Sequence, residues 1–286
     1  MLKNIKICQT VIEIDSPFYP EENFYLDRFL TEDEKADIRV SCVLTEKLPE
    51  VKEKLMGDNS EITVFESENE IFRFSKMGTE DGALTVYSKG VPDCSVTHIF
   101  EKNSRTLLDC RYFWQTISLA QLLLPRDVLF FHASFINADG KGIIFSAPSG
   151  TGKSTQAALW EKYRNAEIIN GDKTGISRFR ETFFANGVPF CGTSDICKNV
   201  SVPLSAVVLL EQAKENSITR LQGISAIEKL ISNIYLDFTA SEERLRCVDL
   251  LIDLISKVPV YLLKCTADEN AVKTLENELQ FNTDRR

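Results

Sequence analysis

Apolar and polar residues alternate along the first third of the chain with the period of β-strands. The alternating runs are short, and polar clusters such as MGTEDG at residues 77–82 separate them. A period of two places one face of a strand in a core and the other face toward solvent. The pattern therefore predicts a β-rich region over residues 1–104, with strands at 5–14, 37–44, 61–66, 70–75, 83–88 and 95–100.

The spacing of apolar residues changes after this region. From Thr106 onward they recur near the helical period, and the run stops at Pro125. Proline lacks a backbone N–H and clashes with the preceding turn, so it ends helices. We predict a helix over residues 106–124 that joins two halves of the chain, which gives domain limits at 1–104, 105–124 and 125–286.

Strand and helix patterns alternate in the remaining part of the chain. We expect strands at 128–137, 142–147, 166–170, 206–210 and 258–265 and a hairpin at 176–187, with helices at 153–164, 224–233, 241–257 and 268–279. Such alternation is typical of a layered α/β domain. The sequence thus predicts an α/β fold with an appended N-terminal β-rich domain.

The charge of the chain is negative and unevenly distributed. The 286 residues carry a formal net charge of -9, from 33 bases and 42 acids. Residues 1–100 hold 20 acids and 11 bases, which leaves 22 of each for residues 101–286. Binding to a phosphate backbone requires a basic face, so we expect no nucleic-acid partner. The acidic N-terminal region is a solvated face or, alternatively, a surface for a basic peptide or protein.

Several further classes of protein are excluded by composition. No run approaches the roughly 20 uncharged apolar residues of a membrane span, and an acid interrupts the N-terminus before a signal-type apolar core, so we expect a cytoplasmic protein without a membrane partner. The eight cysteines form no C-x-x-C motif and are expected to be reduced, mostly buried thiols. With two histidines, His98 and His132, any metal must use oxygen ligands, which favours magnesium. The sequence leaves assembly into a homo-oligomer as an open alternative.

The stretch SAPSGTGKST, residues 146–155, follows an apolar strand and opens a predicted helix. It meets the pattern G-x-x-x-x-G-K-[ST], with alanine in place of the first glycine. Glycines let successive N–H groups point inward, the helix offers its positive N-terminus, Lys153 supplies a charge, and the Ser154 hydroxyl can bind magnesium. We predict that this loop binds the phosphates of a nucleoside triphosphate through Ser149, Gly150, Thr151, Gly152, Lys153, Ser154 and Thr155. An ordinary glycine-rich turn is the alternative.

Phosphoryl transfer also needs a carboxylate and a group that orients the nucleophile. Asp172 is the first candidate because it follows a short apolar strand, although Asn170-Gly171-Asp172 also has the composition of a hairpin turn. Glu211, at the end of another strand, is a second candidate or a solvated acid. His132 alternates with apolar residues in its strand and is either catalytic or a satisfied core histidine.

These segments resemble a known family. The residues FHASFINADGKGIIFSAPSGTGKST followed by EIINGDKTGI resemble the catalytic domain of the HPr serine kinase/phosphorylases. The loop is also similar to that of ATP-dependent phosphoenolpyruvate carboxykinases. A group of short bacterial HPr-kinase-like proteins, often encoded with peptide-modification or unassigned cassettes, carries a segment like GVPFCGTSDICKNVSVPLSAVVLLEQ and a terminal PVYLL strand. The resemblance covers residues 125–286.

The resemblance implies a mixed-sheet P-loop kinase domain of the HPr kinase and phosphoenolpyruvate carboxykinase type. It implies an ATP-dependent kinase that transfers the terminal phosphate to a hydroxyl acceptor, either a serine of a protein or peptide or a small molecule. ATP and Mg2+ would bind at the glycine loop, with Lys153, Asp172 and His132 as catalytic residues and Ser154 and Asp172 as metal ligands.

One position departs from the family. Where the kinases have two adjacent aspartates, this chain has Gly171 and then Asp172. Asp172 would serve both as metal ligand and as base, or Glu211 or Asp195 would share these roles. An ATP-binding regulatory protein without phosphotransfer is therefore the alternative function. Carboxykinase chemistry is disfavoured by the lack of metal-binding histidines. Residues 187–198 are expected to form a loop over the site, with Lys198 either near the transferred phosphate or solvated.

Overall fold

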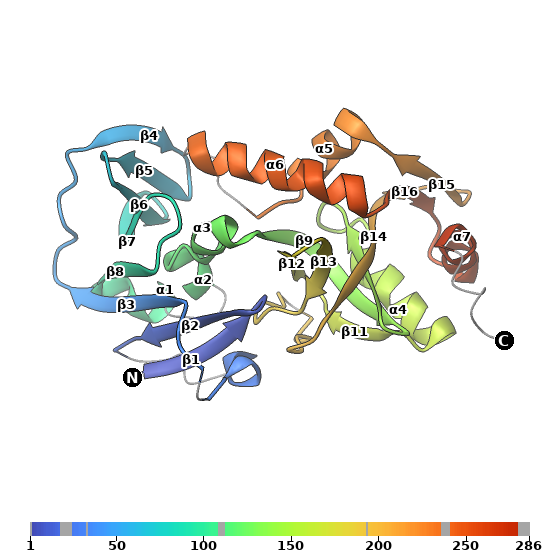
Figure 1. Ribbon diagram of the computed structural model, residues 1–286, viewed down its shortest axis with the longest axis horizontal. Helices are drawn as coiled ribbons and strands as arrows, with labels where there is room; N and C mark the ends of the chain where they lie inside the picture. Colours follow the sequence, from blue (N-terminus) through green and yellow to red (C-terminus); the bar gives the residue numbers. More distant parts are fainter. Residues whose placement is uncertain are drawn as a thin grey trace. The chain divides into compact units, whose positions relative to one another are not determined.

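The chain, seen in a computed structural model, folds into two compact units (Figure 1). The structure describes residues 2–17, 25–32, 34–107, 112–192, 194–235 and 241–279. Unit 1 consists of residues 1–128 and 236–247, and unit 2 consists of residues 129–235 and 248–286. Each unit contains a mixed β-sheet, so the predicted α/β class with a β-rich N-terminal part is confirmed at this level.

Unit 1 is built on an eight-stranded sheet with the order β1-β2-β3-β8-β7-β6-β5-β4. β2 and β3 run parallel, as do β3 and β8, whereas the other neighbours are antiparallel. The strand predicted at 5–14 is in fact two, because Cys8 and Gln9 have φ angles of 50° and 69° and turn the chain back. The strands are β1 (Leu2–Ile7), β2 (Thr10–Asp15), β3 (Ile38–Thr45), β4 (Lys54–Asp58), β5 (Ile62–Glu66), β6 (Glu70–Met77), β7 (Glu80–Ser88) and β8 (Cys94–Phe100).

The segment after β8 corrects the prediction of a single helix over 106–124. It contains the short helices α1 (Ser104–Leu107), α2 (Phe113–Thr116) and α3 (Leu119–Leu123), and residues 108–111 of the predicted helix lie outside the described ones. Ser118 adopts the left-handed conformation, with φ 56° and ψ 39°, which interrupts the helix between α2 and α3. The apolar residues nevertheless serve the core, as Phe113, Ile117 and Leu122 are buried. The 3-10 turns of unit 1 are η1 (Tyr25–Phe29), η2 (Glu101–Asn103) and η3 (Leu124–Arg126).

Unit 2 is built on a second eight-stranded sheet, with the order β10-β9-β12-β13-β14-β16-β15 and β11 paired to β9. β10, β14 and β16 run parallel, while β9 and β10 form an antiparallel hairpin. β12 and β13 form the antiparallel hairpin predicted at 176–187. β14 pairs with β13 through its first residues and with β10 further along. The strands are β9 (Val128–Ala138), β10 (Lys141–Ser146), β11 (Glu167–Asn170), β12 (Lys173–Phe179), β13 (Thr182–Asn186), β14 (Ser201–Gln212), β15 (Ser217–Leu221) and β16 (Val260–Cys265).

The helices that follow these strands have the predicted positions to within two residues. They are α4 (Lys153–Arg164), α5 (Gly223–Ile231), α6 (Ser241–Lys257) and α7 (Glu269–Leu279). In unit 2, α4 and α7 pack against the sheet, with Trp160 and Val272 in one buried cluster with Phe145 of β10 and Val208 of β14. This packing holds the start of α4 close to the end of β10, with the loop of residues 147–152 between them. Figure 1 shows α4 beside the strands of unit 2.

Two predictions from composition can also be compared with the structure. Within the described residues, no helix is long and apolar enough to cross a membrane. The described cysteines are free thiols, and all of them except Cys94 are buried, in agreement with the prediction of reduced, mostly buried cysteines. Cys110 lies outside the described residues.

Candidate functional site

The loop between β10 and α4 places its two glycines in conformations that other residues rarely adopt. Gly150 has a φ of 77° and Gly152 a φ of 118°, and no atom lies within 4 Å of a Cβ added at either position. Backbone conformation and not crowding therefore requires glycine there. Ala147, at the first glycine position of the motif, has no positive φ and is 2% exposed, so alanine is accommodated. Gly152 precedes α4 without a side-chain cap. The first N–H groups of this helix are thus open to an anion.

Lys153 lies beneath this loop. Its side chain is buried, and Nζ donates to the carbonyl oxygens of Ala147 at 3.0 Å and Pro148 at 3.4 Å. Burial lowers the pKa of Lys153, and the negative charge of Asp172 acts in the opposite direction. Ser149, Ser154 and Thr155 are exposed and Thr151 is half-buried. The loop therefore presents hydroxyl groups and a helix N-terminus to solvent above a buried ammonium group.

Gln212 supports the same loop from the end of β14. Its Nε2 donates to the carbonyl oxygens of Gly150 at 3.4 Å and Thr151 at 3.3 Å. These bonds turn the two carbonyl groups toward β14. Sequence analysis did not identify Gln212, although it follows Glu211 at the end of a strand that runs parallel to β10.

Asp172, in the step between β11 and β12, forms a pair with His132 of β9. His132 Nε2 and Asp172 Oδ1 are 3.1 Å apart, and the side chains are 32% and 29% exposed. The hydrogen bond from His132 is the main cause that lowers the pKa of Asp172, with further contributions from the charges of Lys173 and Lys153. The pair lies at the strand end that leads into the loop, because Ser146, the last residue of β10, donates its hydroxyl to His132 O at 2.9 Å and pairs with Ala133, whose N–H donates to Asp172 O.

The hairpin alternative for Asn170-Gly171-Asp172 is wrong. β11 pairs antiparallel with the C-terminal half of β9, and Asp172 O then accepts from Ala133 N of the same strand at 2.9 Å. The chain thus continues along β9 and does not turn back. Asn170 Oδ1 accepts from the backbone N–H groups of Asp172 and Lys173, both at 3.2 Å, and holds the step between β11 and β12.

The departure at Gly171 has a physical counterpart. A Cβ atom at this position would lie 2.2 Å from Ser194 Oγ, so the loop occupies the space that a side chain would need. The same loop places Gly192, with a φ of 57°, so close to Asp172 that an added Cβ would lie 2.8 Å from its Cγ. As expected, part of the segment 187–198 lies against Asp172. The local packing therefore admits one carboxylate at this step.

Lys173 is a further charged residue of this region that the sequence did not indicate. Burial lowers its pKa, which the charge of Asp172 opposes. Its Nζ lies 4.3 Å from the centre of the Tyr235 ring and 5.8 Å from that of Phe190. Contacts with aromatic faces stabilise a partly desolvated ammonium group. Only the folded structure brings these rings to Lys173.

The other candidates lie in different surroundings. Glu211 forms an exposed ion pair with Lys264 of β16 at 2.9 Å, and Lys198 forms one with Glu167 at 2.8 Å. These pairs agree with solvated surface roles for Glu211 and Lys198. In the part of the chain that the structure describes, no three His, Cys, Asp or Glu side chains lie close enough together to hold a metal ion. Asp172 and Asp195 are therefore not part of such a cluster. A magnesium ion in proteins is often held by one or two carboxylates plus substrate phosphates, and Asp172 supplies one such carboxylate.

These features define a mixed α/β protein in which a strand, a glycine loop and a helix lie beside a histidine–aspartate pair. The chain belongs to the SynChlorMet cassette protein ScmC family, which matches residues 96–280, more than half of the sequence. The match includes all of the residues of the site described above.

Two other comparisons give little. No curated protein was found to be similar to the chain. Among solved structures, the Hpr(Ser) kinase/phosphatase from Coxiella burnetii matches with 11% sequence identity and a TM-score of 0.32, covering 54% of this chain and 98% of that chain. A likeness of this extent carries no argument about activity.

Proposed function

We propose that the protein is an ATP-dependent phosphotransferase that moves the terminal phosphate of ATP to a hydroxyl group. The observation that carries the proposal is the hydrogen-bonded pair of His132 and Asp172 next to Ser146, the residue from which the glycine loop begins. The loop conformation and the open start of α4 suit an anion, and the carboxylate beside it suits the metal ion that accompanies polyphosphate. The resemblance of residues 125–286 to HPr kinases points in the same direction.

In the proposed reaction, the acceptor oxygen forms a bond to the γ-phosphorus while the bond from this phosphorus to the β–γ bridging oxygen breaks. ADP leaves, and the proton of the hydroxyl passes to the His132–Asp172 pair or to water. The loop from Ser149 to Thr155 would bind the phosphates, and Lys153 would move from its carbonyl partners to the developing negative charge. A magnesium ion at Ser154 and Asp172 would neutralise charge on the outer phosphates.

The lowered pKa of Asp172 bears on its role. A carboxyl group that stays ionised well below neutral pH is a good metal ligand, whereas a general base works best with a pKa near the working pH. We therefore assign metal binding and orientation of His132 to Asp172. His132 would then be the hydrogen-bond partner of the acceptor hydroxyl.

A nucleotide-binding regulator without phosphotransfer is the second candidate. It is favoured by one observation, the filling of the space beside Gly171 by Ser194, which leaves a single carboxylate at this step. Both candidates require nucleotide binding at the same loop, and they differ in turnover.

The experiment that tests the proposal measures ADP release from magnesium-ATP by the full chain, alone and with small-molecule and peptide fractions of a bacterial extract. Lys153→Ala is the test variant, and Lys162→Ala, an exposed lysine on the same helix, is its matched control. We expect a fraction that raises turnover in wild type and Lys162→Ala. In Lys153→Ala the rate should fall at least about 100-fold, since charge stabilisation in the transition state is lost.

Nucleotide binding, measured by equilibrium dialysis with labelled ATP, separates the two candidates. Binding without turnover in any fraction supports the regulator. Absence of ATP binding by the wild-type protein would contradict both functions.

A further inference from the structure

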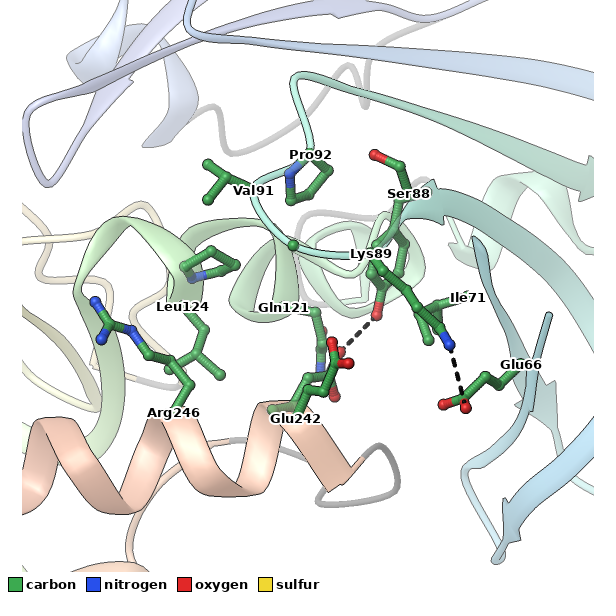
Figure 2. Close-up of a pocket in the computed structure, with 14 residues that line it drawn as sticks. Glu66, Ile71, Ser88, Lys89, Val91, Pro92, Gln121, Leu124, Glu242 and Arg246 are labelled. Carbon is green, nitrogen blue, oxygen red and sulfur yellow. Dashed lines mark hydrogen bonds and ion pairs between the residues drawn. The ribbon is translucent and has the colours of Figure 1, made fainter. Parts of the chain in front are cut away.

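Unit 1 contains a cavity of about 330 Å3 that has no role in the proposed reaction (Figure 2). Strands β5 to β7, the loop at residues 88–92, α3 and η3, and the first turns of α6 line it. All of its lining residues belong to unit 1. Its volume lies at the lower end of the range for small-molecule sites, which is roughly 300–1,000 Å3.

The walls of the cavity are largely apolar. Ile71, Tyr87 and Leu124 are buried residues of the core that face it, and Pro92 and Pro125 complete this surface. Val91, on the loop in Figure 2, is 63% exposed and lies at the rim. Such walls accommodate a hydrocarbon group and give it little orientation.

A polar network fixes a carboxylate in this surface. Tyr87 donates its hydroxyl proton to Glu243 Oε1 at 2.7 Å, and Arg73 Nη1 lies 3.6 Å from Glu243 Oε2. Tyr87 and Arg73 are 5% and 3% exposed. Burial and the charge of Glu243 raise the pKa of Tyr87 well above its usual value, so the phenol remains a donor at neutral pH. Glu243 is therefore held in place before any ligand arrives.

Among the other charged residues around the cavity, one acid has no ion-pair partner in the described part of the chain. Lys89 pairs with Glu66 at 3.2 Å, and Arg246 pairs with Asp127. Arg73 stands opposite Glu243. Glu242, next to Glu243 on the first turn of α6, is exposed and has no ion-pair partner among the described residues. The net charge at the cavity is thus negative, in line with the acidic excess of residues 1–100.

We propose that this cavity binds an organic cation, namely a primary ammonium group attached to an apolar body. The ammonium group would lie at Glu242 and Glu243 of α6, and the apolar body would lie against Ile71, Leu124 and Pro92. An anionic ligand would meet the unpaired charge of Glu242, and a neutral ligand would leave that charge without a partner. The site is separate from the glycine loop of unit 2.

Three probes of similar shape and different charge test this site by isothermal titration of the full chain. They are 2-phenylethylamine, 2-phenylethanol and 3-phenylpropanoate. We expect the amine to bind about tenfold more tightly than the alcohol, since a hydrogen bond to a charged group contributes more than a neutral one, and the anion to bind most weakly. Equal affinities, tighter binding of the anion, or no binding of the amine overturns the proposal.

Three variants locate the binding. Glu242→Gln removes the unpaired charge and should weaken amine binding about tenfold while alcohol binding stays unchanged. Val91→Trp, at the exposed rim, should weaken both by filling the entrance. Glu70→Gln removes an exposed acid of unit 1 outside the cavity and should change neither. Amine binding that survives both Glu242→Gln and Val91→Trp lies elsewhere and overturns the assignment. A loss in Val91→Trp alone overturns the role of Glu242.

Discussion

Asp172 should make the stability of the protein depend on pH. Its pKa is lowered from 3.8 in the folded state, chiefly by the hydrogen bond from His132. A carboxyl group with a lowered folded pKa stabilises the fold above its unfolded pKa, and this contribution is lost as the pH falls through the folded pKa. We expect Asp172→Asn to reduce the free energy of unfolding by about 1 kcal/mol at pH 7, with a difference that shrinks below about pH 4.

Urea denaturation of both proteins between pH 3 and about pH 7 measures this difference. Asp249→Asn removes an exposed acid of α6, is the control, and should leave the free energy of unfolding unchanged. A difference that grows toward low pH would show that the sign of the argument is wrong.

Residues that carry a motif could be predicted, and residues that act through contacts could not. The spacing of Gly150, Gly152 and Lys153 is visible in one short stretch, and the left-handed φ angles agree with the need for glycine. Asp172 was identified through its place after a strand. Lys173 and Gln212 were missed because the aromatic rings and carbonyl groups that they contact come from segments distant in sequence.

The loop between β10 and α4 should depend on β14 for its shape. Gln212 donates two hydrogen bonds to loop carbonyl groups, at 3.4 and 3.3 Å, and so holds the loop in the conformation that offers its N–H groups. If the proposed nucleotide binding is correct, Gln212→Ala should weaken ATP binding about three- to tenfold, since two long neutral hydrogen bonds are lost.

Equilibrium dialysis with ATP measures this effect, and Glu211→Gln is the matched control one residue earlier on β14. The Glu211 side chain pairs with Lys264 at the surface, so its removal should leave ATP affinity unchanged. Equal affinities of wild type and Gln212→Ala would mean that the loop keeps its shape without β14.

At the level of elements, strong local signals were sufficient for α4 of unit 2 and insufficient around residues 104–126. α4 begins and ends at the predicted residues because a glycine turn precedes it and the apolar period is clear. The run over 106–124 has the same period, yet Ser118 breaks it with a left-handed turn that no local signal marks. The short strands β4 and β15 were not predicted because neither has a buried residue and so neither shows the alternation of a strand with one face in a core. Their pairing partners decide their structure.

At the level of the whole molecule, the two candidate sites lie in different compact units. The glycine loop belongs to residues 129–235, and the cavity is lined by residues of unit 1 that include the first part of α6. A ligand stabilises the native state of the region it binds by mass action, by about 2.7 kcal/mol at a concentration of 100 times its Kd. Local opening reactions of that region are suppressed most strongly.

Hydrogen exchange of the full chain should therefore separate the sites. We expect magnesium-ATP to slow exchange in the loop, α4 and β12 of unit 2, and 2-phenylethylamine to slow it in the 88–92 loop and in residues 242–247 of α6. The residues from Val248 to Lys257 of the same helix are assigned to unit 2 and provide an internal comparison. Protection by the amine that is as strong in α4 as in the 88–92 loop would contradict a separate site in unit 1. Protection by ATP confined to unit 1 would contradict nucleotide binding at the loop, since its N–H groups are the ones that must be covered.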